Sequence, residues 1–395
     1  MHKNNRVLSF EISFQDSFYF KVLEKLEHFE KAPMNIVNAS SEESLKYAVL
    51  TLLNGRTISS SRWDYEEILK ATNCKSSLEL SLKGHGLSLS DHYWYKKENE
   101  DLKYENINFF ENEWDDSFGR AILNGDYEAL RSVSLNVPDI VISGWAAKAW
   151  ILENGERYLY KLGINKGNYD ECLGEVLASR CAIRLFGEKE VVKYELKQVN
   201  GTYASVSKCI VNIDDEMIPI DTLLPIKLKE MYYSGHKDRD IIRKFLDQLR
   251  EMGLNDLYET YVKIMCLKTL IFVNDFHFHN VSILRNIETG ATRIAPLYDL
   301  GGAYGSGEKG KQILSNINTG TLFLVYFVYG MLEPEWDYSW YDSSKLDGFE
   351  DELKEVLSKS EFYTPVLIEN IINVYHHQKR HLDEMANNQK EKMNK

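Results

Sequence analysis

The sequence is poor in proline and cysteine, and each shortage excludes a class of protein. Seven Pro and 23 Gly among 395 residues are too few for a linker-rich or low-complexity chain. The five Cys are odd in number and dispersed, and no Cys-x-x-Cys pair offers a zinc site or a thiol-exchange motif. The length of 395 residues, at about 150 per domain, predicts two or three folded domains, and the dispersed Cys are expected to be reduced thiols, as in a cytoplasmic protein.

The sequence also lacks an excess of positive charge and a long apolar segment. Lys and Arg total 47 against 60 Asp and Glu, so the net charge is −13, which disfavours direct binding of nucleic acid or anionic lipid. The longest apolar run, 321–332, is too short to cross a bilayer of roughly 30 Å. Glu11, Gln15 and Asp16 interrupt the apolar residues near the N-terminus, so no signal peptide is expected. These features predict a cytoplasmic protein without a membrane partner.

What the chain does contain is a β-rich stretch followed by an α-rich stretch. Short segments with β-compatible patterns follow Pro138, at 140–143, 149–152, 157–161, 191–196 and 203–210. Helical periodicity appears among them at 169–186 and dominates after Pro225, at 241–252, 254–273, 349–357 and 365–375, before a charged tail from Gln378 that is expected to fray. The pattern predicts an α+β fold with an N-terminal accessory region at 1–115, a β-rich lobe at 116–225 and an α-rich lobe at 226–395. A ligand cleft is expected between the lobes.

Polar residues gather around a predicted β-hairpin in the α-rich half. The segment Asn274–Asn280 precedes two apolar stretches that flank a turn containing Gly290, and the second stretch leads to Asp299. A hairpin returns the chain to its starting edge, so Asp299 is expected to lie close to Asn280 and Asp275. Carboxylate and carboxamide oxygens are ligands that Mg²⁺ prefers, together with phosphate and water.

The spacing of these residues matches the order of functional groups in protein kinases. Asp275-x₄-Asn280, a hairpin and then Asp299-x-Gly correspond to a catalytic Asp, a metal-binding Asn and a metal-binding Asp. Together with His277 and the segment 295–301 (APLYDLG), this arrangement resembles the HipA-like serine/threonine kinases, known from bacterial toxin–antitoxin systems and related effectors. Upstream, three segments look like the family's phosphate loop, its nucleotide-lysine strand and the helix with its paired Glu, namely 143–148, 158–161 and 174–178.

The resemblance implies a two-lobed, kinase-like fold that uses ATP and Mg²⁺ and transfers the γ-phosphoryl group to Ser or Thr of a protein substrate. Asp275 would accept the hydroxyl proton, and Asn280 and Asp299 would hold Mg²⁺. The residues implied in nucleotide binding, with Glu175 positioning the lysine of the strand, are Gly144, Lys148, Lys161 and Glu175. The resemblance also makes Ser143 or a nearby hydroxyl a candidate autophosphorylation site, and an antitoxin-like protein a candidate partner.

Three alternatives remain open at the level of the sequence. The chain could be a pseudokinase that keeps the fold and docks partners without catalysis. His277 and His279 would face the same way in an extended segment and could bind a transition metal with Asp275, as in a metal-dependent hydrolase. The segment 305–312 (GSGEKGKQ) nearly matches a phosphate-binding P-loop, but Gln312 stands where the pattern requires Ser or Thr. We therefore interpret that segment as an activation loop or lid.

Overall fold

The computed structural model divides into two compact units. It describes residues 1–14, 18–163, 170–223, 239–251, 256–273, 277–303 and 336–393, together with residues 228, 230, 253, 254, 332 and 334. The first unit comprises Met1–Asn165, Lys208–Ile218 and Leu284–Thr292, and the second comprises Lys166–Ser207, Pro219–Ile283 and Arg293–Lys395. The predicted boundaries at residues 115 and 225 concern lobes and not these units, so they stay predictions.

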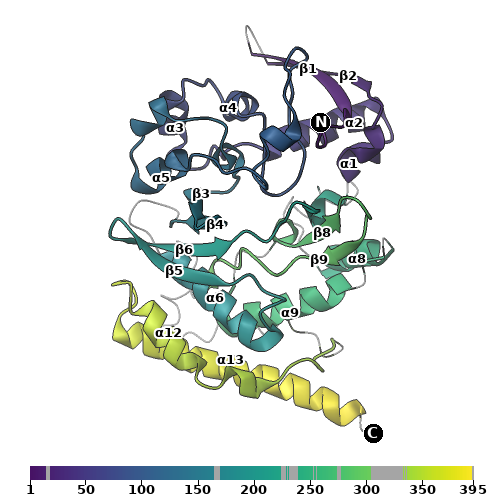
Figure 1. Cartoon of the computed structure of the whole chain (residues 1–395). Coiled ribbons are helices and arrows are strands. Elements are labelled where there is room, and N and C mark those ends of the chain that lie inside the picture. The colour runs from purple at the N-terminus through teal and green to yellow at the C-terminus, as the bar shows by residue number, and fades with distance from the viewer. Residues whose placement is uncertain are drawn as a thin grey trace. The chain divides into compact units, whose positions relative to one another are not determined.

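The first unit begins with an antiparallel strand pair, followed by short helices and a second hairpin (Figure 1). Its principal elements are β1 (Leu8–Ser13), β2 (Tyr19–Lys25), α1 (Met34–Val37), α2 (Glu42–Gly55), α3 (Tyr65–Ala71), α4 (Ser77–Lys83), α5 (Ser117–Asn124), β3 (Lys148–Glu153) and β4 (Glu156–Lys161). Serine side chains cap the N-termini of two of these helices. The hydroxyl of Ser41 accepts the backbone N–H of Ser44 at the start of α2, and the hydroxyl of Ser76 accepts that of Glu79 at the start of α4.

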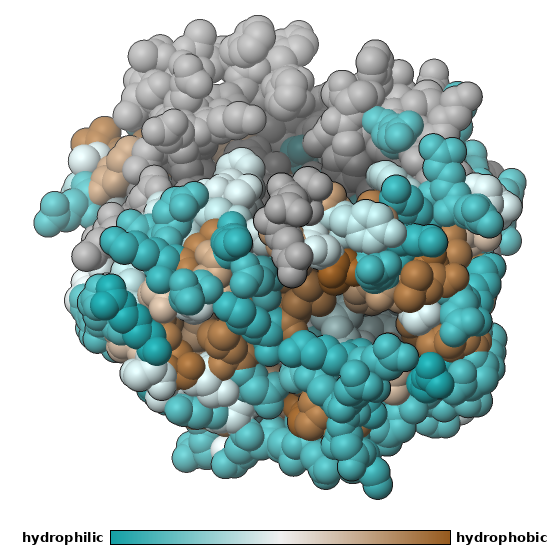
Figure 2. Space-filling view, turned by 90° about the horizontal axis from the view of Figure 1, so that it is seen from above, coloured by the Kyte–Doolittle hydropathy of each residue, from teal (hydrophilic) through white to brown (hydrophobic). Residues whose placement is uncertain are grey.

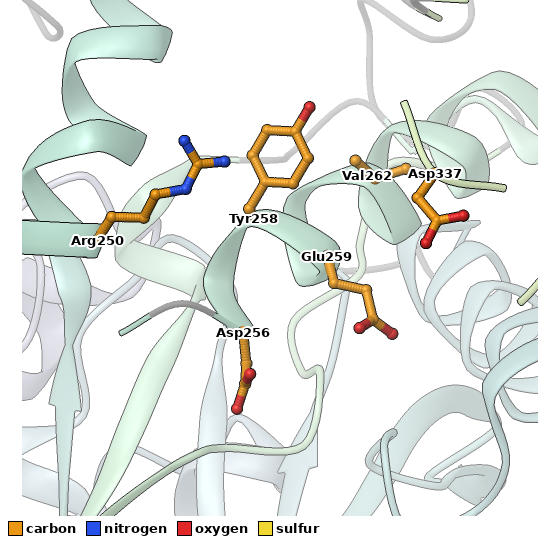
Figure 3. Close-up of a pocket in the computed structure, with 6 residues that line it drawn as sticks. All are labelled: Arg250, Asp256, Tyr258, Glu259, Val262 and Asp337. Atoms are coloured by element: carbon orange, nitrogen blue, oxygen red, sulfur yellow. The ribbon is translucent and has the colours of Figure 1, made fainter. Parts of the chain in front are cut away.

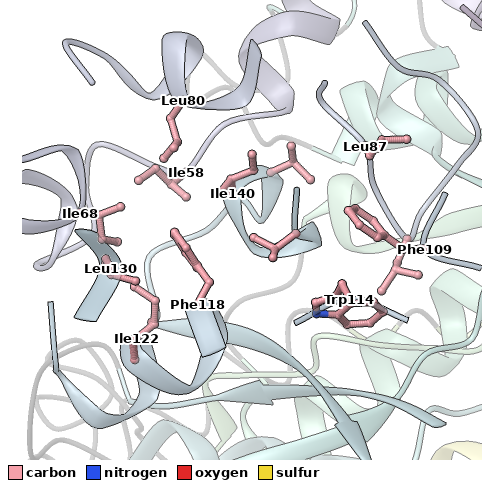
Figure 4. Close-up of a cluster of buried hydrophobic side chains, with 14 of the residues drawn as sticks. Ile58, Ile68, Leu80, Leu87, Phe109, Trp114, Phe118, Ile122, Leu130 and Ile140 are labelled. Atoms are coloured by element: carbon pink, nitrogen blue, oxygen red, sulfur yellow. The ribbon is translucent and has the colours of Figure 1, made fainter. Parts of the chain in front are cut away.

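A large apolar core lies in the first unit and joins residues that are far apart in the sequence. Its buried side chains come from α3, α4, α5 and the loops between them, and Figure 4 shows Ile58, Leu80, Phe118 and Ile140 among them. Helix α5 ends at Gly125, whose φ of 67° places it in the left-handed region that favours glycine. The accessory region expected at 1–115 therefore shares this core with residues up to Ala147.

Two hairpins of the β-rich stretch are closed by Asn-Gly turns. Both residues of each turn have positive φ, 54° and 78° at Asn154-Gly155 and 50° and 78° at Asn200-Gly201, as a type I′ turn requires. The first turn connects β3 and β4 in the first unit, and the second connects β5 (Tyr194–Val199) and β6 (Thr202–Lys208). The registers pair Lys148 with Lys161 and Tyr194 with Ser207. The strands predicted at 149–152, 157–161 and 203–210 are confirmed within a few residues, whereas β5 begins three residues later than predicted.

The strand predicted at 140–143 is wrong, because the chain forms a 3₁₀ helix there. This helix, η4, spans Pro138–Val141, with the proline in its first turn. Asp139 of η4 is 2% exposed, and its Oδ1 accepts the backbone N–H of Trp150 at 2.8 Å. The other carboxyl oxygen, Oδ2, is buried without a hydrogen-bond partner among the residues that the structure describes. Burial raises the pKa of Asp139 from 3.8 to about 7.

This raised pKa makes the stability of the fold depend on pH. Between pH 3.8 and about 7, Asp139 holds a proton in the folded state that the unfolded state releases. The free energy of unfolding therefore falls as the pH rises through this range. Asp139→Asn keeps an oxygen acceptor for Trp150 and removes the charge. We expect the variant to be more stable than the wild type above pH 7, by on the order of 3 kcal/mol, and the gain to vanish near pH 4.

Urea unfolding at several pH values measures this difference. Asp126→Asn, which changes an exposed carboxylate of the same unit, is the matched control and should show no such trend. A stability difference between Asp139→Asn and the wild type that does not change with pH would contradict the assignment.

The second unit is mainly helical. Its principal elements are α6 (Asp170–Phe186), β5, β6, α8 (Arg239–Glu251), α9 (Asp256–Ile271), α12 (Phe349–Leu357) and α13 (Pro365–Met393). The residues of β8 (Ser282–Asn286) and β9 (Thr292–Ile294) are divided between the two units. The 3₁₀ helix η5 (Ile220–Leu223) also belongs to this unit, and it follows β7 (Asp215–Pro219), most of which belongs to the first unit. Helix α6 contacts α9 and α12, and α13 contacts α9 and α12. The helices predicted at 169–186, 241–252, 254–273 and 349–357 are confirmed within a few residues.

Helix α13 is longer than predicted, and the expectation of a fraying tail after Gln378 is wrong. It continues to Met393 because apolar and polar contacts hold its second half. Leu382 and Ala386 are buried. The hydroxyl of Tyr341 donates to Asp383 at 2.8 Å. Further along the helix, Nε2 of Gln389 donates to the carbonyl of Trp336 at 2.7 Å. These tertiary contacts supply the stability that the charged sequence alone does not indicate.

On the face seen in Figure 2, the residues in colour are mostly hydrophilic, and smaller hydrophobic groups lie between them. No helix in the described ranges is long and apolar enough to cross a membrane. Phe18, Tyr19, Leu23 and Trp145 are large hydrophobic residues that remain exposed.

Candidate functional site

The β8–β9 hairpin brings Asn280 and Asp299 together, as the sequence predicts. Its strands are joined by a bond from the N–H of Ala295 to the carbonyl of Ser282 at 2.9 Å. The turn contains Gly290, with a φ of 72°. Across the base of the hairpin, Asn280 Nδ2 lies 3.4 Å from the backbone oxygen of Asp299 and donates to it. Two residues separated by 19 positions thus meet through local chain reversal alone.

A buried aromatic stack places Asn280. Asn280 is the last residue of the 3₁₀ helix η6 (Phe278–Asn280) and is 8% exposed. The ring of Phe278 stacks on Phe245 of α8, with centroids 3.6 Å apart and an interplanar angle of 12°. This apolar contact anchors η6 to a helix that also carries the buried Leu249. The Asn280 amide is therefore directed by its buried neighbours and by the Asp299 carbonyl.

Backbone hydrogen bonds fix the segment that ends at Asp299. The N–H of Val192 donates to the carbonyl of Leu297, and the N–H of Leu297 donates to the carbonyl of Glu190, both at 2.8 Å. The N–H of Asp299 donates to the hydroxyl of Tyr194 at 3.1 Å. Asp299 has a φ of 51°, a left-handed conformation that Asp tolerates better than most residues. Such strained backbone is often found at functional sites, where surrounding contacts maintain it.

Tyr298, which follows β9, forms hydrogen bonds to both β8 and η6. Its hydroxyl lies 2.7 Å from the hydroxyl of Ser282 and donates to the carbonyl of His279 at 3.2 Å. Because a phenol has one proton, the bond to His279 makes Ser282 the donor to Tyr298. Burial raises the pKa of Tyr298 well above its ordinary value, so the group stays a hydroxyl at neutral pH.

Asp221 is a polar neighbour of this site that the sequence did not indicate. It lies in η5, next to Ile220, whose N–H donates to the carbonyl of Val281 at 2.9 Å. The Asp221 carboxylate is buried, and its Oδ1 lies 3.1 Å from Nδ1 of His279. A single Asp after a β segment is also typical of a turn, so the sequence offers no pattern that points to its contact with His279.

Glu175 is buried on the inner side of α6. It is 1% exposed, and its carboxylate accepts a hydrogen bond from the hydroxyl of Ser205 in β6. Lys161, the predicted partner of Glu175, belongs to the other unit, so their ion pair stays a prediction. Ser205 was not singled out in the sequence; it is buried in β6, and its side chain points to the opposite face from those of Ala204 and Val206.

The C-terminal half of α6 is held by an ion-pair cluster with α12. Arg184 Nη2 lies 2.7 Å from Glu352 Oε1, and Arg180 Nη1 lies 3.4 Å from Glu352 Oε2 and 3.2 Å from Glu355 Oε2. Arg184 also donates to the carbonyl of Asp347 at 2.8 Å. These four side chains connect the helix that carries Glu175 to the C-terminal helices.

The predicted phosphate loop lies in the first unit, between η4 and β3. Gly144 has a φ of 103°, which an L-residue rarely adopts, and a Cβ placed on it would lie 2.7 Å from Lys148 Nζ. The Lys148 ammonium therefore packs against the backbone of Gly144. Lys161, at the end of β4, is buried and paired in register with Lys148. Ser143 precedes Gly144 directly, and its role as an autophosphorylation site stays a prediction.

Several predicted features fall outside the described residues. Asp275, the expected base, is among them, and so is the glycine-rich segment 305–312. Among the residues that are described, no group of three His, Cys, Asp or Glu side chains could hold a metal ion. The hydrolase alternative needs Asp275 beside His277 and His279, so this finding leaves that alternative untested.

A small pocket of the second unit lies among residues that the sequence did not single out. It encloses about 200 Å³ and is lined by Arg250, Asp256, Tyr258, Glu259, Val262 and Asp337 (Figure 3). The guanidinium of Arg250 lies 4.8 Å from the centre of the Tyr258 ring. Ligand pockets for drug-sized molecules usually enclose about 300 Å³ or more. The pocket includes none of the predicted site residues, and we assign no nucleotide to it.

Comparison with known proteins supports the architecture through structure and not through sequence. No protein-family model matches the chain, and no curated protein matches it. The chain is similar to HipA of Shewanella oneidensis MR-1, solved with HipB of the same toxin–antitoxin system and its operator DNA, with a TM-score of 0.55 and 9% identity over 98% of both chains. It also matches the proinflammatory kinase CtkA of Helicobacter pylori, with a TM-score of 0.44 and 15% identity over 61% of this chain and 93% of that one.

The likeness to HipA extends over nearly the whole chain, and it agrees with the fold that the residue spacing predicts. The match to CtkA has a lower TM-score and adds nothing to this conclusion. The operator DNA belongs to the HipA structure, and our expectation that this chain binds no nucleic acid directly stays a prediction. The resemblance to HipA-like kinases is thus confirmed at the level of the fold: the chain has the two-lobed, kinase-like α+β fold of HipA.

Proposed function

We propose that the chain is a HipA-like serine/threonine protein kinase that transfers the γ-phosphoryl group of ATP to a protein hydroxyl. The observation that carries the proposal is the contact between Asn280 and the Asp299 backbone across the β8–β9 hairpin. This contact supports the proposal because the two residues follow the chain order in which kinases carry their metal-binding Asn and Asp. The HipA-like fold supports the proposal independently.

The donor atoms of this site suit Mg²⁺. The amide oxygen of Asn280 and the carboxylate of Asp299 are hard oxygen ligands, and neither residue brings a thiol or imidazole that would favour a softer metal. When bound, Mg²⁺ would offset the negative charge of the ATP phosphates. Asn280 and Asp299 are the residues proposed to hold it.

The remaining steps are assigned to side chains of the chain itself. Asp275 accepts the proton of the Ser or Thr hydroxyl while that oxygen bonds to the γ-phosphorus, and the bond from phosphorus to the bridging oxygen breaks to release ADP. Gly144 lets backbone N–H groups approach the phosphates, and Lys148 adds positive charge beside them. Lys161 binds the α- and β-phosphates, with Glu175 positioning it.

Incubation with Mg²⁺ and γ-labelled ATP tests the proposal. A kinase labels a protein or peptide hydroxyl, whereas a pseudokinase binds nucleotide without transferring phosphate. The absence of transfer from a folded wild-type chain to any Ser or Thr, its own included, would refute the kinase assignment.

A further inference from the structure

A buried side chain joins the two ends of the segment between η4 and β3. Oδ1 of Asp139, in η4, accepts the backbone N–H of Trp150, in β3, at 2.8 Å, across eleven positions of the chain. The segment between them contains residues 143–148, which the proposed function assigns to the phosphate loop. Where this segment enters β3, the N–H of Leu162 also donates to the carbonyl of Ala147 at 2.9 Å. The carboxyl group of Asp139 is therefore in position to hold the loop closed.

The contact between Asp139 and Trp150 lies where a strand, a 3₁₀ helix and helix α5 meet. On one side, β3 pairs with β4, and Ala149 lies opposite Tyr160. On the side of α5, a Cβ placed on Gly119 would lie 3.0 Å from Asp139 Oδ1 and 3.0 Å from the carbonyl oxygen of Trp150. The glycine leaves room for the hydrogen bond at this close approach. Because Asp139 is also almost fully buried, water has little access to replace the bond.

The same burial makes the closed loop sensitive to the charge of Asp139. Its second oxygen, Oδ2, has no hydrogen-bond partner among the described residues, so an ionised carboxylate is poorly stabilised there and gains solvation when η4 separates from β3. We propose that Asp139 is a positioning residue that closes the phosphate loop, and that loss of its proton favours an open loop that binds nucleotide more weakly. The inference rests on the proposed kinase function and adds regulation of its nucleotide site by pH.

The charges around Asp139 place this transition near neutral pH. Burial is the largest cause that raises its pKa to about 7, while Arg62 lowers the pKa and Asp116 raises it. Both of these residues have ion-pair partners of their own, Asp64 and Arg120, each at 2.7 Å. The further charged side chains on α4, α5 and β3, which pack against η4, are Glu79, Lys83, Arg120, Lys148 and Glu153.

Hydrogen exchange at the Trp150 amide, followed by mass spectrometry of peptides that contain it, measures how often the loop opens. Opening returns Asp139 to its ordinary pKa of 3.8, so the opening equilibrium rises about tenfold per pH unit up to about pH 7 and is then constant. From pH 6 to pH 8, we therefore expect the protection of Trp150, corrected for the intrinsic exchange rate, to fall about tenfold.

Two substitutions of Asp139 separate its charge from its hydrogen bond. Asp139→Asn keeps an acceptor for Trp150 and has no charge to lose, so the protection of Trp150 should no longer depend on pH. Asp139→Ala removes the acceptor and should lower that protection at both pH values, to about a tenth of that in Asp139→Asn. The matched control is Asp116→Asn, because Oδ2 of Asp116 accepts the N–H of Leu152 at 3.2 Å, farther along β3 from the loop. This control should retain the fall in protection with pH.

The effect of nucleotide connects loop closure to the proposed function. A non-hydrolysable ATP analogue with Mg²⁺, at ten times its Kd and pH 8, should raise the protection of Trp150 about tenfold if it binds the closed loop. An added protection of this kind distinguishes a loop that holds nucleotide from a merely structural bond between η4 and β3.

The inference fails if the wild-type protection of Trp150 does not change with pH, or if the change persists in Asp139→Asn. It also fails if Trp150 is as well protected as the best-protected amides of the first unit, since opening is then global, or if bound nucleotide adds no protection. These comparisons still decide the question if Asp139→Ala does not fold. If the wild type binds no nucleotide, the proposed function fails, whereas the pH comparison still tests whether Asp139 closes the segment.

Discussion

Asp299→Ala is expected to abolish phosphate transfer and to remove the effect of Mg²⁺ on nucleotide binding. The proposed site offers Mg²⁺ the Asp299 carboxylate and the Asn280 amide oxygen, and alanine deletes the charged ligand of the two. Charge stabilisation by a metal is worth several kcal/mol in such reactions, so transfer should fall by at least about 10²-fold. Calorimetric titration with a non-hydrolysable ATP analogue, with and without Mg²⁺, measures the loss of binding directly.

The control for this variant is Asp351→Ala, which removes an exposed carboxylate from α12 of the same unit. It should bind the Mg²⁺ nucleotide like the wild type. Because Asp299 has a positive φ, alanine also brings some backbone strain, and thermal unfolding of the variant measures that cost. If folded Asp299→Ala binds the Mg²⁺ nucleotide as tightly as the wild type, Asp299 is not a metal ligand.

Asp275→Asn is expected to lower phosphate transfer by at least about 10²-fold, the usual scale for loss of a general base. The carboxamide keeps the size of the side chain but cannot accept the hydroxyl proton. Nucleotide affinity should be largely retained, because the contribution of a base arises chiefly in the transition state. Single-turnover transfer from labelled ATP measures the rate, and the same titration used for Asp299 measures affinity.

The two substitutions therefore have different signatures. Asp299→Ala should lose both binding and turnover, whereas Asp275→Asn should lose turnover alone. An unchanged rate of transfer in Asp275→Asn would contradict its assignment as the base. Zinc or iron binding at His277 and His279 by a wild type that binds no nucleotide would favour the hydrolase alternative over the kinase.

The parts of the site that the sequence predicts are those that local chain geometry determines. Asn280 and Asp299 flank two β segments and a Gly-containing turn, so a hairpin alone brings them together. Helices α6 and α12 have regular apolar spacing, and the structure contains both close to the predicted positions. The β3–β4 hairpin follows from the Asn154-Gly155 turn in the same way.

The parts that the sequence does not predict depend on contacts between distant residues. Asp221 reaches His279 across 58 positions, and no spacing rule connects them. The second half of α13 is polar in sequence, and its contacts with residues near Tyr341 become visible only in the folded chain. The segment 140–143 has β-compatible residues, but Pro138 and the buried Asp139 favour a 3₁₀ turn.

The ion pairs between α6 and α12 hold one end of α6 more firmly than the other. Arg180 and Arg184 tie its C-terminal end to Glu352, whereas Glu175 lies nine residues before Arg184, about 14 Å along the helix axis. A tilt of about 10° around the tied end would displace Glu175 by about 2 Å, enough to break a hydrogen bond such as the one from Ser205. A rotation of α12 that moved the tied end of α6 would thus be felt at the buried contact between Glu175 and Ser205.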